Sequence, residues 1–191
     1  MLMRLGKRLR GAPGAFRRDR RGVAAVEFAF VAPIMIVLFV GTLELSNSIA
    51  TSRKLSRLSS TLADLITQGQ RLTTSDVDAI MDVSSKIMYP YGDEVKMIIT
   101  GVQISNNKAT VVWSRSRNTN GYSAGQNYTV PARIMTNNTF LVAARVSTSY
   151  KPTIGWIHYE APAGISFTTN AIEMDEEIFL RPRVGSDVKL Q

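Results

Sequence analysis

The longest apolar pattern in the chain lies near its N-terminus. Between Val23 and Val40 every side chain is apolar except that of Glu27. A helix of this length rises about 27 Å, close to the ~30 Å thickness of the hydrocarbon core of a bilayer. Charged residues return at Glu44. The pattern therefore predicts a transmembrane helix over residues 23–45.

Beyond this run, apolar residues recur with the period of an amphipathic helix. Their spacing places them on one stripe of a helix with 3.6 residues per turn. The stripe consists of Leu55, Leu58, Leu62, Leu65 and Ile66. Such a stripe must pack against a folded domain, so we expect the helix to extend over residues 46–72, with Gly69 near its end.

A second, shorter helix is predicted before Pro90. Ser75 and Asp78 have the three-residue spacing of an N-terminal helix cap. A proline disfavours the helical conformation in the residue before it, so Tyr89 should lie outside the helix. The broad face of this helix comprises Val77, Ile80, Met81, Ser84, Ile87 and Met88.

From residue 95 onward, apolar and polar positions alternate as they do in β-strands. Asn106 and Asn107 separate two such runs and favour the positive φ angles of a tight hairpin turn. The predicted strands are residues 95–105, 109–115, 139–150 and 177–181, with a Gly- and Asn-rich loop at 117–131 and mostly connection at 152–170. Helices followed by an antiparallel sheet predict an α+β fold, with an exported domain at residues 73–191.

The positive charge of the chain is concentrated at its N-terminus. Of the formal net charge of +8, the first 22 residues contribute +7, because they hold eight of the 23 Lys and Arg residues and one of the 15 Asp and Glu residues. The nearly neutral remainder argues against nucleic acid as a partner. The positive-inside rule instead keeps residues 1–22 in the cytoplasm as a basic leader and exports the chain after about Ser46.

No arrangement of nucleophile and base predicts an enzyme. His158 is the only histidine, and its position between aromatic residues indicates packing. Serine and lysine stand three positions apart at Ser105 and Lys108, on the expected hairpin turn, and at Ser186 and Lys189, in the C-terminal tail. Neither place is a rigid scaffold for a nucleophile, so we expect no catalytic residue.

The sequence predicts neither a metal site nor a cofactor. It contains no cysteine, which excludes disulfides and thiolate ligands within it. The densest acidic cluster comprises Glu173, Asp175, Glu176 and Glu177. This cluster lacks the glycine and the alternating oxygen ligands of a calcium loop, so we interpret it as a solvated edge.

Glu27 is the residue that an ordinary membrane anchor does not explain. A carboxylate in hydrocarbon costs about 2.5–3.5 kcal/mol at the bilayer centre and less near an interface. One interpretation is that Arg20 and Arg21 screen it from the cytoplasmic side. In the other, a peptidase cuts between Gly22 and Val23, and the new terminal ammonium lies one helical turn from the acid. In a packed array of such helices, the two charges of neighbouring subunits can then neutralise each other.

The stretch RRGVAAVEFAFVAPIMIVLFVGTLEL resembles the TadE/TadG-like minor pilins of the bacterial tight-adherence (Tad, or Flp) pilus. The basic leader, Gly22 before the cut, Glu27 as the fifth residue after it and the apolar helix are similar to the class III signal of type IV pilins and pseudopilins. An aromatic residue, Phe28, follows the acid, and Pro33 recurs in this segment of the family. The resemblance is looser in the rest of the chain.

The resemblance implies roles for these residues. A prepilin peptidase would cut between Gly22 and Val23, Arg20 and Arg21 would belong to the leader, and Glu27 would be the assembly or recognition acid. The implied partners are this peptidase, other pilins or pseudopilins, the Tad membrane assembly proteins and the lipid bilayer. The implied location is the bacterial inner membrane, with the C-terminal domain in the periplasm. The resemblance also implies that the protein can be incorporated into the extracellular pilus and takes part in pilus assembly and adhesion.

Two other interpretations of the same pattern stay open. The first is an uncleaved single-pass membrane protein with an exported binding or sensor domain, which an intact N-terminus would favour. The second is a membrane-tethered hydrolase that uses His158. Whichever interpretation holds, Pro33 lacks the amide that would bond the Ala29 carbonyl, so we expect the helix to bend or loosen at this position.

Overall fold

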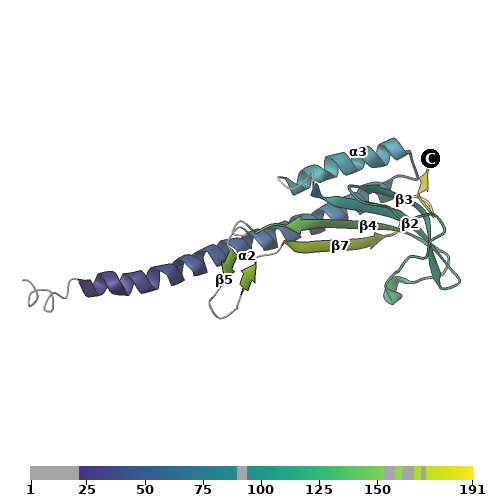
Figure 1. The fold of residues 1–191 in the computed structure, drawn as a ribbon. Helices are drawn as coiled ribbons and strands as arrows, with labels where there is room; N and C mark the ends of the chain where they lie inside the picture. Colours follow the sequence, from purple (N-terminus) through teal and green to yellow (C-terminus); the bar gives the residue numbers. More distant parts are fainter. Residues whose placement is uncertain (1–21, 90–93, 153–157, 161–165, 169–170) are drawn as a thin grey trace, which may run out of the picture. The chain divides into compact units, whose positions relative to one another are not determined.

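The computed structural model describes residues 22–89, 94–152, 158–160, 166–168 and 171–191. These residues form a long helix, a short helix and an antiparallel four-stranded sheet, which confirms the predicted α+β class (Figure 1). The elements are α2 (Val23–Gln68), β1 (Arg71–Leu72), α3 (Thr74–Ser85), η2 (Lys86–Met88), β2 (Lys96–Ser105), β3 (Lys108–Arg117), η4 (Ala132–Ile134), β4 (Thr139–Tyr150), β5 (His158–Glu160), β6 (Ser166–Thr168), β7 (Ile172–Leu180) and β8 (Lys189–Leu190).

Helix α2 joins the two compact units of the chain, which divide between Leu45 and Ser46. Its first part is long and apolar enough, by length and composition, to cross a membrane. Side-chain hydroxyls bond back to the helix in both parts, as in the 2.9 Å bond that Thr51 Oγ1 donates to the carbonyl of Asn47. The helix ends at Gln68, one residue before Gly69 and four residues short of the predicted end at residue 72. Residues 71 and 72 instead form strand β1, because they pair with β8.

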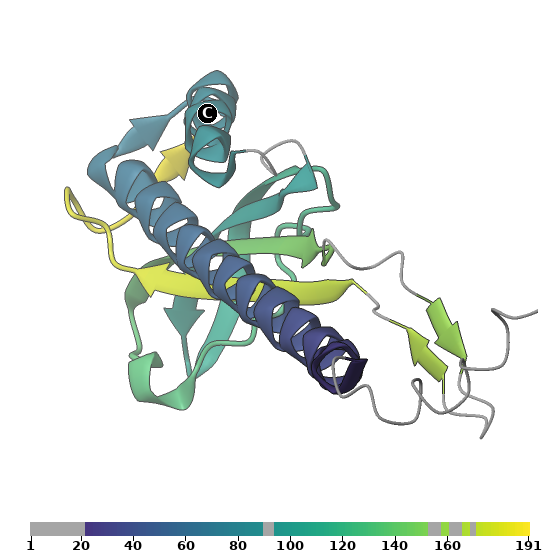
Figure 2. The same ribbon diagram turned by 90° about the vertical axis from the view of Figure 1, so that its left-hand side faces the viewer.

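The second part of α2 packs its apolar stripe on one face of the sheet. Figure 2 shows the helix crossing this face. Leu58, Leu62 and Ile66 are fully buried, whereas Leu65 of the predicted stripe is only half-buried. Each fully buried side chain of this kind contributes about 1.5–3 kcal/mol relative to an exposed one. The sheet side of this inner core comprises Met97, Ile99, Trp113, Phe140, Val142, Ala144 and Val146.

The main sheet has the order β3-β2-β4-β7, with every neighbouring pair antiparallel. Strands β2 and β3 are joined at Asn106 and Asn107, whose φ angles of 50° and 57° fit the predicted tight turn. Between Trp113 and Val111 the pairing with β2 shifts register, which leaves Val112 as an extra residue in β3. This β-bulge reverses the alternation, so Trp113 packs in the inner core and Val111 on the opposite face of the sheet.

A second core lies on the face of the sheet that α2 does not cover. Tyr128 and Val130, from the segment predicted to be a long loop, pack there against Val102, Ile104 and residues of β3 and β4. The loop is held by backbone bonds in addition, including the 2.9 Å bond from the Tyr128 amide to the Ala109 carbonyl. The loop therefore serves as a cover that closes this half of the sheet.

Helix α3 begins at a different cap from the predicted one. Thr73, and not Ser75, is the N-cap, and its hydroxyl accepts from the Asp76 amide at 3.2 Å. The Asp76 carboxylate accepts from the Thr73 amide at 2.8 Å, and this bond lowers the pKa of Asp76. Asp78, the other half of the predicted cap, instead binds Arg115 of β3 at 2.6 Å, which ties α3 to the sheet.

The C-terminal third contains more strand than the sequence predicts. Strand β7 starts at Ile172, five residues before the predicted start at Glu177, and pairs with β4 along its whole length. The short strands β5 and β6 pair with each other within the segment predicted to be mostly connection. His158 belongs to β5, but its side chain lies outside the described part of the structure.

Candidate assembly site at the start of the long helix

The predicted cleavage position coincides with the first residue of α2. The helix begins at Val23, and Glu27 follows at the i+4 position, on the same side of the helix. A terminal ammonium on Val23 would therefore lie within one turn of the carboxylate. No described residue offers Glu27 a hydrogen bond or an ion pair. Val23 and Glu27 are both exposed at this end of the helix.

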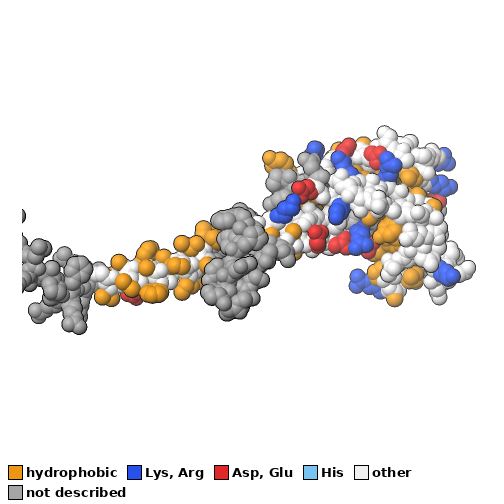
Figure 3. All heavy atoms as spheres, in the orientation of Figure 1, with side chains coloured by type: hydrophobic (Ala, Val, Ile, Leu, Met, Phe, Trp, Pro, Cys, Tyr) orange, Lys and Arg blue, Asp and Glu red, His pale blue; other side chains and the backbone are white. Residues whose placement is uncertain are grey.

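The side chains around this pair form an unbroken apolar surface. Phe28 and Phe30 are 72% and 73% exposed, and the apolar side chains that follow are exposed to a similar degree. Figure 3 shows hydrophobic side chains over this part of α2. Soluble monomers rarely expose a contiguous apolar patch of more than a few hundred Å². This surface therefore requires lipid or other apolar helices around it.

Pro33 lies inside this surface, and α2 continues through it. Because proline has no amide hydrogen, the carbonyl of Ala29 lacks its usual donor in the helix. Apolar surroundings tolerate such a position in a long helix better when a neighbouring helix or hydroxyl can satisfy the carbonyl. The expected kink at Pro33 stays a prediction.

Two of the predicted site residues, Arg20 and Arg21, lie outside the described residues. The structure thus brings together Gly22, Val23 and Glu27 at the start of α2. Their roles in cleavage and assembly rest on spacing and exposure, and they stay predictions at this point.

Comparison with known families classifies this part of the chain. Residues 22–63 match the model of the TadE-like protein family. Over this stretch, which we refer to as the TadE-like segment, the chain is similar to that family. No curated protein and no solved structure matches the chain.

The TadE-like segment contains the whole candidate site and part of the packed half of α2. It begins at Gly22, next to the predicted cut, and it includes Glu27 and Pro33. The sheet and α3 lie outside it. The family match therefore supports an interpretation of the membrane-length helix. The role of the remaining domain has to be inferred from the residues of that domain.

Among the described side chains outside the TadE-like segment, the candidate catalytic serines and lysines do not form a site. Ser105 and Lys108 are paired across the β2–β3 turn and are exposed. Ser186 is exposed in the tail that precedes β8, which contains Lys189. Over the ranges that the structure describes, His, Asp and Glu side chains do not form a group of three that could hold a metal ion.

The acidic cluster is divided between the two faces of β7. Glu176 lies toward α2, where its carboxylate accepts from the Ser56 hydroxyl at 3.5 Å, whereas Asp175 and Glu177 lie on the opposite face. Asp175 accepts from Arg145 of β4 through both carboxylate oxygens, at 2.7–3.1 Å. Alternation along the strand thus separates Glu176 from the other three carboxylates, and of these Asp175 is already paired with Arg145.

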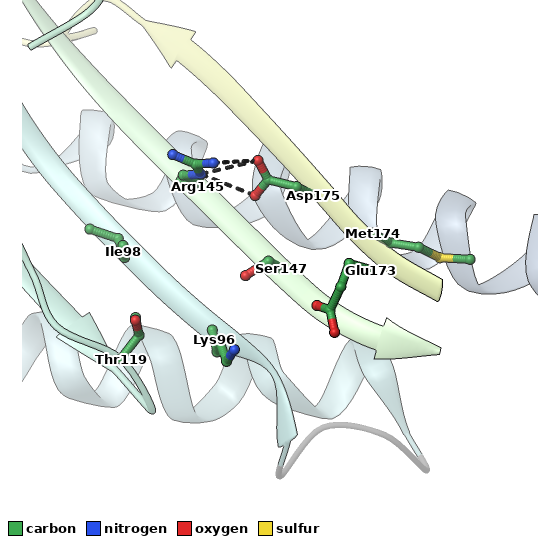
Figure 4. A pocket seen from close by; sticks show the side chains of 8 residues that line it. All are labelled: Lys96, Ile98, Thr119, Arg145, Ser147, Glu173, Met174 and Asp175. Carbon is green, nitrogen blue, oxygen red and sulfur yellow. Dashed lines mark hydrogen bonds and ion pairs between the residues drawn. The ribbon is translucent and has the colours of Figure 1, made fainter. Parts of the chain in front are cut away.

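A shallow hollow of about 320 Å³ lies over the start of β2 and β7 (Figure 4). The ion pair of Arg145 with Asp175, together with a hydrogen bond to the Tyr122 hydroxyl, raises the pKa of the Arg145 side chain. Lys96 and Glu173 stand at the border of the hollow. Arg145 and Asp175, the other two charged residues that line the hollow, are therefore already paired with each other. Such a pair is typical of a structural contact between strands.

Tyr128 links the covering loop to the same face. Its hydroxyl donates to the Glu177 carboxylate, and its ring packs edge-on against Tyr122 with centroids 5.0 Å apart. Burial, together with this hydrogen bond, raises the pKa of the Tyr128 hydroxyl well above its usual range. The sequence did not predict this contact, because a loop tyrosine and a strand glutamate 49 positions apart share no local pattern.

Proposed function

We propose that this protein is a minor pilin or pseudopilin of a Tad-type pilus. The observation that carries the proposal is the apolar, exposed start of α2, in which Glu27 follows Val23 by one turn inside the TadE-like segment. An acid at this place is costly in a simple anchor. It becomes favourable once a neighbouring subunit supplies a positive charge.

The proposed sequence of events begins with insertion. The basic leader stays in the cytoplasm, and α2 spans the inner membrane with the α+β domain in the periplasm. A prepilin peptidase then cuts between Gly22 and Val23, where the absence of a Cβ on Gly22 suits an extended substrate in a narrow cleft. The products are the leader, with Arg20 and Arg21, and a mature chain that starts with the ammonium of Val23.

Assembly then follows from the surface of α2. The apolar side chains of the segment pack against the helices of other pilins or pseudopilins. The Glu27 carboxylate of one subunit meets the Val23 ammonium of the next, so each charge offsets part of the desolvation cost of the other. The packed half of α2 holds the α+β domain on the outside, where it caps or decorates the pilus and takes part in adhesion. The protein itself performs no chemical reaction.

Complementation of a strain that lacks this protein tests the proposal. Wild-type protein should restore surface pili, whereas Gly22→Leu, which places a branched side chain at the cut, should not. Gly11→Leu alters the leader to the same extent but away from the cut, and it should restore pili. Normal pili in the strain without the protein would overturn the role in assembly. Full restoration by the Gly22→Leu variant without cleavage would favour an uncleaved membrane protein with an exported binding domain.

A further inference from the structure

A basic groove lies along the packed half of α2, next to η2. It is lined by Arg53, Ser56, Arg57, Ser60, Thr61 and Ile87 and has a volume of about 490 Å³. Arg53 and Arg57 are exposed and stand one turn apart, so both guanidinium groups extend from the same side of α2. Ile87, from η2, forms an apolar wall beside them.

The two guanidinium groups have no carboxylate partner within the described residues. An acid of the sheet, Glu176 of β7, borders the groove, since its carboxylate accepts from the Ser56 hydroxyl at 3.5 Å. A third cation, Lys54, stands on the adjacent side of the helix and donates to the Tyr89 carbonyl at 2.9 Å. Positive charge therefore exceeds negative charge around the groove.

The donors of the groove match a phosphate group. Each guanidinium presents a rigid fork of N–H donors that fits two oxygens of a phosphate. Ser60 and Thr61 have hydroxyl groups on the same face, but the Ser60 hydroxyl donates its hydrogen to the Ser56 carbonyl at 2.7 Å, so the two guanidinium groups supply the main donors. A carboxylate ligand would use fewer of these donors than a phosphate does.

The place of the groove in the sequence indicates the source of the phosphate. Arg53 follows Leu45 by eight positions in the same helix, which corresponds to about 12 Å of rise. Helical side chains lean toward the N-terminus of their helix, and for α2 this is the direction of the apolar segment. Tyr89, whose carbonyl binds Lys54, is 78% exposed and belongs to the residue type that is enriched at bilayer interfaces.

The positive-inside bias makes these cations unusual. Arg53, Lys54 and Arg57 lie within 15 residues of the end of the apolar segment, on the flank that the basic leader should send across the membrane. Cations on this flank oppose the orientation that the leader sets, so a benefit at the bilayer surface would account for them.

We propose that Arg53 and Arg57 form a binding site for the phosphate of an anionic lipid headgroup, at the surface of the bilayer that α2 spans. This inference rests on the membrane-spanning role of α2 in the proposed function, but not on cleavage or pilus assembly. The site would hold the domain close to the membrane before the subunit enters a fibre, because the contact is lost once α2 leaves the lipid.

The test uses the full chain in nanodiscs of phosphatidylcholine and phosphatidylglycerol. The ratio of the two lipids that remain bound to the protein is measured by native mass spectrometry. The wild type should enrich phosphatidylglycerol, and the double variant Arg53→Gln/Arg57→Gln should reduce this enrichment by on the order of tenfold. The control Arg71→Gln/Arg133→Gln removes the same charge at exposed positions of β1 and η4 and should leave the enrichment unchanged.

Each other outcome contradicts the proposal in its own way. Equal losses in both double variants would mean that net charge alone attracts the lipid. Unchanged enrichment in the Arg53→Gln/Arg57→Gln variant would mean that the groove does not bind it. An excess of inorganic phosphate should leave the enrichment intact, and its abolition would assign the groove to a soluble anion. If alkaline extraction removes the wild type from vesicles, the membrane-spanning role fails as well.

Discussion

The indole N–H of Trp113 donates to the main-chain carbonyl of Val188 at 2.7 Å, and this bond fixes the C-terminal tail to the inner core. The ring of Trp113 lies over Gly101 of the neighbouring strand. Val188 is itself buried, and the tail continues into β8, which pairs with β1 directly after α2. The bond therefore connects the edge strand β3 to the tail, which in turn pairs with the segment that follows the long helix.

Gly101→Ala should destabilise the domain more than a surface glycine substitution does. A Cβ at this position would lie 2.5 Å from Trp113 Nε1 and 2.7 Å from Phe140, so the rings must move. We expect a loss of about 1–3 kcal/mol of unfolding free energy, as for other overpacked cores. Gly41→Ala is the control, because a Cβ at this position would have no atom within 4 Å apart from the adjacent backbone of the helix. The measurement is thermal unfolding of the full chain in detergent, and equal stability of the two variants would contradict the assigned packing.

Thr73→Ala should lower stability by about 1 kcal/mol, because it removes the side chain that caps α3. Ser75→Ala, at the cap position that the sequence alone predicts, should change stability by less than about 0.5 kcal/mol. Chemical unfolding of both variants gives the comparison. The reverse order of the two effects would restore Ser75 as the cap.

The stability of the domain should fall as the pH rises above about 10. The folded state holds the Tyr128 proton to a higher pH than the unfolded chain does, because burial raises its pKa from the ordinary value of 10.0. Above this value the unfolded state loses the proton and the folded state keeps it, so proton release favours unfolding. Tyr128→Phe should flatten the decline, whereas Tyr89→Phe, at an exposed position, should not. The measurement is the unfolding midpoint of the wild type and both variants across alkaline pH. An identical decline of stability in all three proteins would refute the role of Tyr128.

Glu27→Val should improve membrane insertion and impair assembly, since it removes both the cost of the acid and its pairing with a neighbour. On insertion scales the gain is up to about 3 kcal/mol at the bilayer centre and smaller near an interface. Glu27→Asp keeps the charge and should do less harm to assembly. The fraction of protein that resists alkaline extraction and the yield of sheared pili are the two measurements. A valine variant that supports normal pili would show that the acid has no part in assembly.

The parts of the fold that depend on local periodicity could be predicted from the sequence. The stripe of Leu58, Leu62 and Ile66 is buried, the Asn106–Asn107 turn closes the β2–β3 hairpin, and β4 has the predicted bounds. The cap of α3 could not be chosen in this way, because two candidate pairs overlap within six residues. In the structure Thr73 and Asp76 form the capping box, whereas Asp78 binds Arg115, a distant residue.

Long-range partners also explain the missed strand and the missed surfaces. Acidic residues disfavour a strand in isolation, but Asp175 in β7 is neutralised by Arg145 of β4. The contact of Tyr128 with Glu177, and the groove that Arg53 shares with Ile87, likewise join segments with no common pattern. For the candidate site, the sequence supplied the spacing of Gly22, Val23 and Glu27, and the structure adds the exposed apolar surface around them.

The N-terminus of the native protein tests the central claim most directly. Protein purified from its own membranes should begin at Val23 when the prepilin peptidase is active and should retain its leader when that peptidase is absent, as read by intact mass and N-terminal sequencing. Native material that keeps the leader in cells with an active peptidase would leave Glu27 without the proposed ammonium partner, and it would contradict the account.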